Sequence, residues 1–286
     1  MTCSASGGDV ARAAELLQGA RRVLIGAGAG LSAAAGLSYG GERFVRNFAP
    51  FIEKYGMTDM YAAGFYPFPS EEARWGYWAR HVWVNRHEPG ALPLYRALRA
   101  FAREHDSFVI TTNVDARFEK AGFPPERLFA TQGDYGLLQC ARGCHDALYP
   151  NRELVAHMLA RTEDCLVPSD LVPACPVCGG PMAVHLRVDG HFVEDTAWRA
   201  AQERYRRFVE GMVREPAVLL ELGVGWNTPG IVRFPFEALA RATGAPLVRL
   251  NYDDAHLPEG VPGVGLQGDI AELWPRIASA AERGKL

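Results

Sequence analysis

The sequence predicts an α/β fold: a doubly wound, Rossmann-like parallel sheet with a smaller zinc-binding and helical subdomain. Three observations support this prediction. Short apolar runs are each followed by a polar or glycine-rich loop and then by a helical pattern, which is the repeating unit of a doubly wound sheet. Four cysteines form a C-x3-C pair and a C-x2-C pair, separated by thirty residues. Residues 39–88 are rich in aromatic side chains, which distinguishes this segment from the rest of the chain.

Composition narrows the classes of function. The chain has 286 residues, of which 48% are hydrophobic, so it can bury a large core. Its 30 basic and 33 acidic residues nearly balance, and no basic stripe of the kind that binds nucleic acid occurs. The N-terminus lacks the basic and apolar regions of a signal peptide, and no apolar run approaches the ~20 residues that cross a bilayer. We therefore expect a cytoplasmic protein that binds neither nucleic acid nor membranes.

The first half of the chain is predicted to alternate helices and buried strands. Strands are assigned to short apolar runs, and helices to apolar positions that recur every three or four residues. Asp9 can cap the first helix. The aromatic segment is interpreted as a helical insertion over the mouth of the ligand site, with most of its rings in its own core. The predicted elements are a helix 10–18, a strand 23–25, a helix that begins at 32, the insertion 39–94, a helix 95–104, and strands 108–111 and 128–130.

The second half of the chain is predicted to begin with a zinc-binding module, 137–186. A long helix, two strands and a final helix complete the pattern; they are expected at 196–212, 217–222, 246–250 and 270–281. All parts are expected to belong to one domain, 1–286. The Rossmann-like lobe of this domain is predicted to consist of residues 1–38, 95–136 and 187–286.

A glycine-rich turn follows the first predicted strand. Glycines such as Gly28 and Gly30 allow a backbone to approach a pyrophosphate, whose charge is stabilised by amides at a helix N-terminus. The alternative is that these glycines serve only the geometry of a tight strand–helix turn. The acidic ribose partner that usually follows about twenty residues later in hydride-transfer enzymes is not clear here. The turn therefore indicates a nucleotide site but not an ordinary dehydrogenase.

Polar side chains follow two other predicted strands. Asn113 can hold an amide or a ribose hydroxyl, and Asp115 can orient an amide or stabilise developing positive charge. Asn251 and Asp253 could likewise hold an adenosine ribose. For both pairs the alternative is a local turn in which the asparagine bonds its own backbone. In doubly wound sheets ligands bind beyond the carboxyl ends of the strands, so these motifs are expected to share one site.

The four cysteines are the most specific signal in the chain. Short C-x3-C and C-x2-C spacings allow Cys140, Cys144, Cys175 and Cys178 to surround one zinc ion. Because all four ligands are thiolates, no coordination position remains open, and the metal is expected to be structural. In a reducing compartment such pairs favour metal binding over disulfides. His145 is interpreted as a bystander beside the ligands.

Taken together, these motifs resemble the sirtuin family. The resemblance covers residues 20–275, and its matching segments occur in the family's order. They are the cofactor-binding signature at 28–37, the Q-N-I-D loop at 112–115, the H-G pair at 132–133, the four cysteines, the phosphate-binding turn at 223–225, the N-x-E motif at 251–253 and the adenine-side loop at 268–270.

The resemblance implies NAD as co-substrate and a structural zinc ion. It places catalysis on Asn113, Asp115 and Gln132. The residues expected to contact NAD are Gly28, Ala29, Gly30, Leu31, Ser32, Thr112, Asn113, Asp115, Gln132, Gly223, Val224, Gly225, Asn227, Asn251, Asp253, Asp269 and Ile270.

Three departures from the family's pattern bear on the reaction. The family's general base is histidine, but the corresponding residue is Gln132, whose amide does not titrate. The P-D-F-R loop reads Ser-Tyr-Gly-Gly at 38–41, so its aromatic and arginine are missing unless Phe44 and Arg43 take their place. The glutamine of Q-N-I-D is Thr112. Segments 26–36, 51–55, 132–136 and 223–229 resemble one subgroup in these respects, the microbial class M sirtuins.

The subgroup implies an NAD-dependent protein mono-ADP-ribosyltransferase. Its members are often encoded beside a macrodomain protein and a lipoylated carrier that resembles the glycine-cleavage H protein, so such a carrier is the expected acceptor. Three alternatives remain open at this point. They are an NAD-dependent deacylase with a displaced base, an NAD glycohydrolase, and a sensor that binds NAD or ADP-ribose without catalysis.

Overall fold

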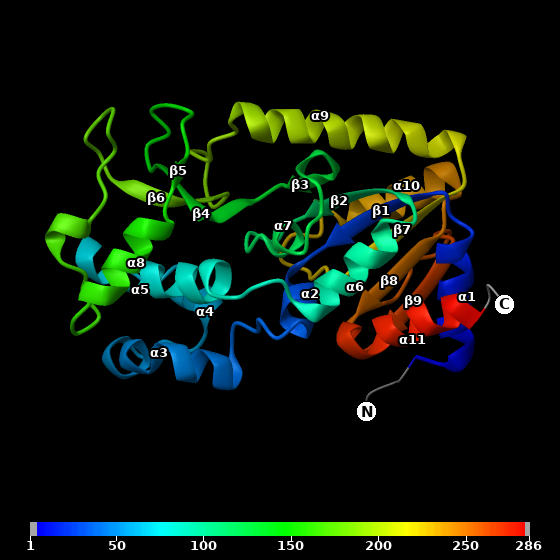
Figure 1. Cartoon of the computed structure of the whole chain (residues 1–286), viewed down its shortest axis with the longest axis horizontal. Coiled ribbons are helices and arrows are strands. Elements are labelled where there is room, and N and C mark those ends of the chain that lie inside the picture. Colours follow the sequence, from blue (N-terminus) through cyan, green and yellow to red (C-terminus); the bar gives the residue numbers. More distant parts are fainter. Residues whose placement is uncertain (1–4, 284–286) are drawn as a thin grey trace.

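The structure is a computed structural model that describes residues 5–283, and it consists of a larger and a smaller lobe (Figure 1). The larger lobe contains a six-stranded sheet with the strand order β3-β2-β1-β7-β8-β9, in which every neighbouring pair is parallel. This confirms the predicted sheet. Its strands are β1 (Arg22–Ala27), β2 (Asp106–Thr111), β3 (Leu128–Ala130), β7 (Ala217–Leu222), β8 (Leu247–Asn251) and β9 (Gly263–Gln267).

Helices cover both faces of this sheet because its central strands are apolar on both sides. In β1, Val23 and Ile25 point into one core and Leu24 into the other. The first core is closed by α1 (Gly7–Gln18), α6 (Pro93–Ala102) and α11 (Ile270–Arg283). The second is closed by α9 (Thr196–Gly211), η4 (Met212–Arg214) and α10 (Arg233–Thr243). Figure 1 shows α9 as a long helix along the outside of the sheet.

The cap of the first helix differs from the prediction. Ser6, rather than Asp9, is the N-cap residue of α1, and its hydroxyl accepts a hydrogen bond from the Asp9 amide. The Asp9 carboxylate in turn accepts from the Ser6 amide, so the two form a reciprocal capping box. The helix therefore begins three residues earlier than its apolar pattern suggests.

The smaller lobe combines the helical insertion with the cysteine-bearing segment. Its second sheet is antiparallel, in the order β5-β4-β6. Trp75 of the insertion lies in one core with Met158 and Met182 of the cysteine-bearing segment. The elements of this lobe are α3 (Gly41–Tyr55), α4 (Met60–Ala63), α5 (Glu71–Val82), the π-helix η1 (Trp83–His87), β4 (Gly133–Cys140), β5 (Tyr149–Pro150), α8 (Arg152–Arg161), η3 (Ser169–Leu171) and β6 (Met182–Leu186).

Most rings of the insertion pack against one another. Phe44, Phe48, Phe51 and Tyr77 are buried in a separate core of the smaller lobe, which also contains the thiol of Cys165. This agrees with the prediction that the aromatic residues chiefly form the insertion's own core. Among the helices of residues 5–283, none combines the length and apolar character needed to cross a bilayer.

Candidate functional site

The predicted motifs lie together at the carboxyl edge of the larger sheet. Strand β1 leads into α2 (Ala29–Ala34), and β2 leads through Asn113 and Asp115 into α7 (Arg117–Lys120). After the 3-10 turn η2 (Pro125–Arg127), β3 ends beside Gln132, where the chain passes into the smaller lobe. Parallel strands end at one edge, so residues distant in the sequence reach one place.

The two glycine turns of the site pack directly against each other. The amides of Gly28 and Gly30 donate to the carbonyl oxygens of Leu222 and Gly223, at 3.0 and 2.9 Å. A Cβ atom on Gly30 would lie 2.8 Å from the Gly223 Cα, and Gly223 itself has a φ of +61°. Close packing of the turns after β1 and β7 therefore requires these glycines. The Gly28 and Gly30 amides are paired within the fold, so a pyrophosphate at this helix N-terminus would have to be held by other amides. The approach of a pyrophosphate to this turn stays a prediction.

Asn113, Ser32 and Asp115 form a hydrogen-bonded cluster at the end of β2. The Asn113 Nδ2 atom donates to the carbonyl oxygen of Gly28 at 3.0 Å and to Ser32 Oγ at 3.1 Å. The Ser32 hydroxyl donates to Asp115 Oδ2 at 2.6 Å. The sequence predicts these residues as ligand contacts, and the structure shows that they hold one another in place.

Asp115 is a buried carboxylate whose pKa is shifted by its surroundings. Burial raises its pKa, and the Ser32 hydrogen bond and the charge of Arg117 oppose that rise. The Arg117 guanidinium, also buried, donates through Nε to the Asp115 carbonyl oxygen at 2.8 Å. A carboxylate held in a poorly solvated place interacts strongly with any positive charge that develops beside it.

Arg86 links the two loops that carry the predicted catalytic residues. Its side chain makes a bidentate ion pair with Asp134, at 2.7 and 3.0 Å, near the start of β4 and two residues after Gln132. Its carbonyl oxygen accepts hydrogen bonds from Arg117 Nη2 and Lys120 Nζ, at 2.7 and 2.6 Å. The end of the π-helix therefore fixes both loops relative to the smaller lobe.

Gln132 has a half-buried side chain that is available to a ligand. The main-chain carbonyl oxygen of Gln132 accepts a hydrogen bond from the Arg187 amide at 3.0 Å. Within residues 5–283 the side-chain amide of Gln132 makes no hydrogen bond. Gly133 follows with a φ of +103°, and a Cβ atom there would lie 2.1 Å from the His185 carbonyl oxygen. The turn geometry thus fixes the backbone of Gln132 and leaves its carboxamide free.

Phe44 and Arg43, the possible substitutes for the aromatic residue and the arginine of the P-D-F-R loop, make other contacts in the structure. Phe44 is only 2% exposed and stacks on Phe48 in the insertion core, so it cannot face the site. Arg43 donates to the carbonyl oxygens of Ser38 and Val84, at 2.9 and 2.7 Å. The aromatic ring of this loop is Tyr39, whose hydroxyl lies 2.8 Å from that of Tyr135.

The side predicted to hold adenosine is built mainly from turns. The Asn251 side chain donates to the Val224 carbonyl oxygen at 2.9 Å and accepts from the Asp253 amide at 3.0 Å. Its carboxamide therefore forms the local turn that was the alternative to binding ribose. The side chain of Ile270 is buried in the first core, which leaves only its backbone for a ligand. Asp269 accepts from the Ala271 amide at 2.8 Å at the start of α11.

Other predicted contacts are open to solvent. Ala29, Gly225, Asn227 and Asp253 are exposed, and Thr112 is half-buried. Leu31 of α2 is fully buried in the first core, and Val224 is buried in the second core. A ligand could reach Asn227 and Asp253 through their side chains, and Gly225, Leu31 or Val224 only through the backbone.

Sequence reasoning missed a buried ion-pair network beneath the turns that are predicted to hold adenosine. Arg249 is fully buried and pairs with Glu221 at 2.8 Å and with Glu237 at 2.7 Å. Nearby, Arg233 pairs with Asp254 at 2.9 Å. The only signal in the sequence is a single charged residue within each apolar strand, since buried charges are rare unless paired.

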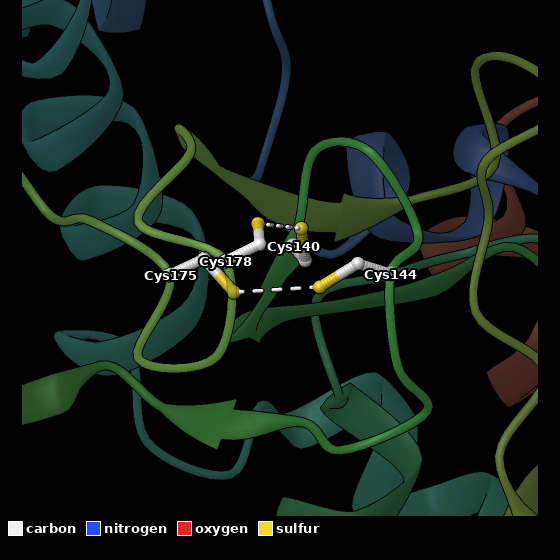
Figure 2. Close-up of side chains that lie close together, drawn as sticks. All are labelled: Cys140, Cys144, Cys175 and Cys178. Atoms are coloured by element: carbon white, nitrogen blue, oxygen red, sulfur yellow. Dashed lines mark hydrogen bonds between the residues drawn. The ribbon is translucent and has the colours of Figure 1, made fainter.

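The four cysteines meet in the smaller lobe as predicted. Figure 2 shows the four side chains pointing toward one another. The sulfurs of Cys140, at the end of β4, and Cys178 are 3.7 Å apart, and those of Cys144 and Cys175 have the same separation. All four sulfurs lie within 4.8 Å of one another. Sulfurs bound about 2.3 Å from one tetrahedral zinc ion are about 3.8 Å apart, so the group fits structural zinc.

His145 stands beside this group without replacing a ligand. Its Nδ1 atom lies 3.1 Å from Cys144 Sγ, and its Nε2 atom lies 2.8 Å from the Tyr149 hydroxyl. A tautomer with hydrogen on Nδ1 can donate to the sulfur and accept from tyrosine. This geometry supports an outer contact to a metal-bound thiolate.

Comparison with known proteins identifies the family. No protein-family model matches the chain. A solved Sir2 enzyme superposes on 97% of this chain and 99% of its own, with a TM-score of 0.63 and 19% identity. A protein ADP-ribosyltransferase from Staphylococcus aureus (strain Mu50) is 36% identical over 255 residues, which are 88% of this chain and 81% of that protein. The chain belongs to the sirtuin family.

Two further relatives of this sirtuin carry the names of different activities. A probable bifunctional ADP-ribose hydrolase/ADP-ribosyltransferase from Fusarium oxysporum is 38% identical over 293 residues. The match covers 94% of this chain and 48% of that protein, so the sirtuin spans about half the length of this relative. An NAD-dependent protein deacylase from Pseudomonas putida is 26% identical over 276 residues, which are 95% of this chain and 94% of that protein.

Proposed function

We propose that this sirtuin is an NAD-dependent protein mono-ADP-ribosyltransferase. One observation carries the proposal: Gln132, which cannot act as a base, occupies the place of the family's histidine, beside an otherwise assembled Asn113–Ser32–Asp115 cluster. The relatives named ADP-ribosyltransferase, at 36% and 38% identity, support it.

The residues of the cluster have separate roles in this reaction. Asp115 stabilises positive charge on the ribose as its bond to nicotinamide lengthens. Asn113 orients the nicotinamide and its ribose, and Gln132 holds a ribose hydroxyl through its free carboxamide. The C1′–nicotinamide bond breaks, a bond from C1′ to the acceptor side chain forms, and the acceptor's proton passes to solvent. No base on the protein is needed to activate a second ribose hydroxyl.

The absent base disfavours the rival deacylase. In deacylation the acyl oxygen attacks C1′, and a base must then activate the 2′-hydroxyl. General-base catalysis contributes about 10²–10⁴-fold, so that second half would be slow with Gln132. Direct attack by an acceptor side chain omits this half. The relative from Pseudomonas putida keeps deacylation as the second candidate.

A finer proposal concerns the subgroup and its partners. We place the chain in the class M sirtuins and propose a lipoylated carrier resembling the glycine-cleavage H protein as acceptor. A macrodomain protein would remove the ADP-ribose, and the bifunctional hydrolase/transferase relative supports such a pairing. A zinc site of four thiolates fits the predicted cytoplasmic location, where thiols stay reduced.

The function is tested by incubating the purified protein with labelled NAD, with and without a lipoylated H-like carrier. We expect the carrier to gain the mass of one ADP-ribose, with equimolar nicotinamide, and the Asn113→Ala variant to give neither. Nicotinamide release without any carrier would indicate a glycohydrolase. Binding without release under both conditions would indicate a sensor, and acyl-ADP-ribose from an acylated peptide would indicate a deacylase.

The role of Gln132 gives a separate prediction. We expect Gln132→His to raise deacylation of an acylated peptide by about 10-fold or more, because histidine restores a group that can take a proton. Transfer of ADP-ribose should change less. The measurement is the ratio of acyl-ADP-ribose to ADP-ribosylated carrier under matched NAD. An unchanged ratio would contradict the assigned role.

A further inference from the structure

Tyr95 touches the site but belongs to none of its motifs. It lies on α6, is fully buried, and its ring meets the edge of Phe118 with centroids 5.0 Å apart. Its hydroxyl lies 2.8 Å from Ser32 Oγ and 3.5 Å from Asn113 Nδ2. A buried hydroxyl at this position needs a polar partner, and within residues 5–283 its partners are these two side chains.

The donors and acceptors of the cluster fix the direction of each hydrogen bond. The Gly28 carbonyl can only accept, so the amide nitrogen of Asn113 must face it, and Oδ1 points away from the cluster. Ser32 has one proton, which it donates to Asp115. The hydrogen bond between Tyr95 and Ser32 must therefore be donated by Tyr95. The resulting chain runs from Tyr95 to Ser32 to Asp115.

We propose that Tyr95 is a positioning residue for the transfer reaction. By donating to Ser32 it keeps the serine hydroxyl donating to the Asp115 carboxylate, and by accepting from Asn113 Nδ2 it holds Asn113 in the orientation that presents Oδ1 to the ligand. The inference rests on the proposed function. Hydrogen bonds in such a chain polarise one another, so the first donor strengthens the last bond.

These hydrogen bonds from Tyr95 through Ser32 favour the ionised form of Asp115. Burial raises the pKa of Asp115, and the Ser32 hydrogen bond is the first contribution that lowers it again. If the Tyr95 hydroxyl is removed, Ser32 is free to turn its proton away, and the pKa of Asp115 should rise further. The other titratable groups that interact with Asp115 are Tyr39, Arg86, Arg117, Glu119 and Tyr135, and they are unchanged by this substitution.

The test compares Tyr95→Phe with the unmodified protein as a function of pH, with nicotinamide release as readout. We expect kcat to fall about 10-fold, as for loss of a hydrogen bond within a charged network. The acidic limb of the profile should move to higher pH, with the KM for NAD within about 2-fold. Tyr77→Phe is the matched control, since Tyr77 is another buried tyrosine whose hydroxyl makes two hydrogen bonds, and it should leave the profile in place.

A double-mutant cycle separates positioning from general loss of stability. If Tyr95 acts through Ser32, adding Tyr95→Phe to Ser32→Ala should cost no further activity. Additive losses, an unmoved acidic limb, or an equal loss in Tyr77→Phe would overturn the inference while the proposed function stands. Failure of the unmodified protein to release nicotinamide with any acceptor would overturn the proposed function and this role with it.

Discussion

Asp115→Asn should lower transfer of ADP-ribose by about 10²–10³-fold, which is the loss usually seen when one preorganised group that stabilises transition-state charge is removed. The substitution keeps the shape of the side chain and the hydrogen bond from Ser32, so the cluster should remain assembled. What disappears is the negative charge that we propose lies beside the ribose of NAD. We therefore expect the fall in kcat, with little change in NAD binding measured by calorimetry.

The same residue sets an expected pH dependence. The carboxylate is the active form, and burial raises its pKa, so activity should fall as the pH drops through a value above the ordinary range for aspartate. Asp115→Asn should lack this acidic limb because the amide does not titrate. A limb that persists unchanged in the variant would assign the titration to another group.

A matched control distinguishes this effect from a general change of charge. Asp170 is an exposed aspartate in the smaller lobe that pairs with Arg161 at 2.7 Å. Asp170→Asn removes one exposed carboxylate without touching the cluster, and its activity should stay within about 2-fold, as surface pairs contribute little. Equal losses in both variants would contradict the role of Asp115.

The sheet could be predicted because its signals are local. Five of the six strands are apolar runs that end in glycine or a polar residue, and the site motifs follow from those ends. The sixth, β9, contains Gly263 and Gly265 and is largely half-exposed at the sheet edge, so no apolar run marks it. Helix α10 was missed for a related reason, since Pro235 interrupts its pattern.

The supporting shell of the site could not be predicted in the same way. Tyr95, Arg86 and Arg249 act through partners 12 to 63 residues away in the chain, and nothing in their neighbouring sequence indicates those contacts. Phe44 does not face the site for a similar reason: its ring direction is decided by tertiary packing in the core of the insertion. Sequence motifs therefore placed the predicted ligand contacts at one edge of the sheet, and they left out the residues that hold those contacts in position.

The cysteine group gives the second large expected effect. Cys175→Ser should remove zinc and destabilise the protein by at least about 3 kcal/mol, because structural zinc contributes its binding free energy to folding. Cys140 and Cys175 are buried in the core that joins the insertion to the cysteine-bearing segment. Loss of the metal should thus loosen the whole smaller lobe, detectable by zinc content, thermal unfolding and limited proteolysis within residues 137–186.

The loss should reach the catalytic site through a single strand. Strand β4 begins at Gly133, directly after Gln132, and ends at Cys140, so the zinc group anchors the strand that carries the Gln132 loop. We expect Cys175→Ser to lose transferase activity together with its zinc. Cys165→Ala is the matched control: it removes a buried thiol outside the zinc group and should keep one zinc per chain. Full zinc content in Cys175→Ser would contradict the ligand set, whereas loss of zinc with intact activity would contradict the coupling through β4.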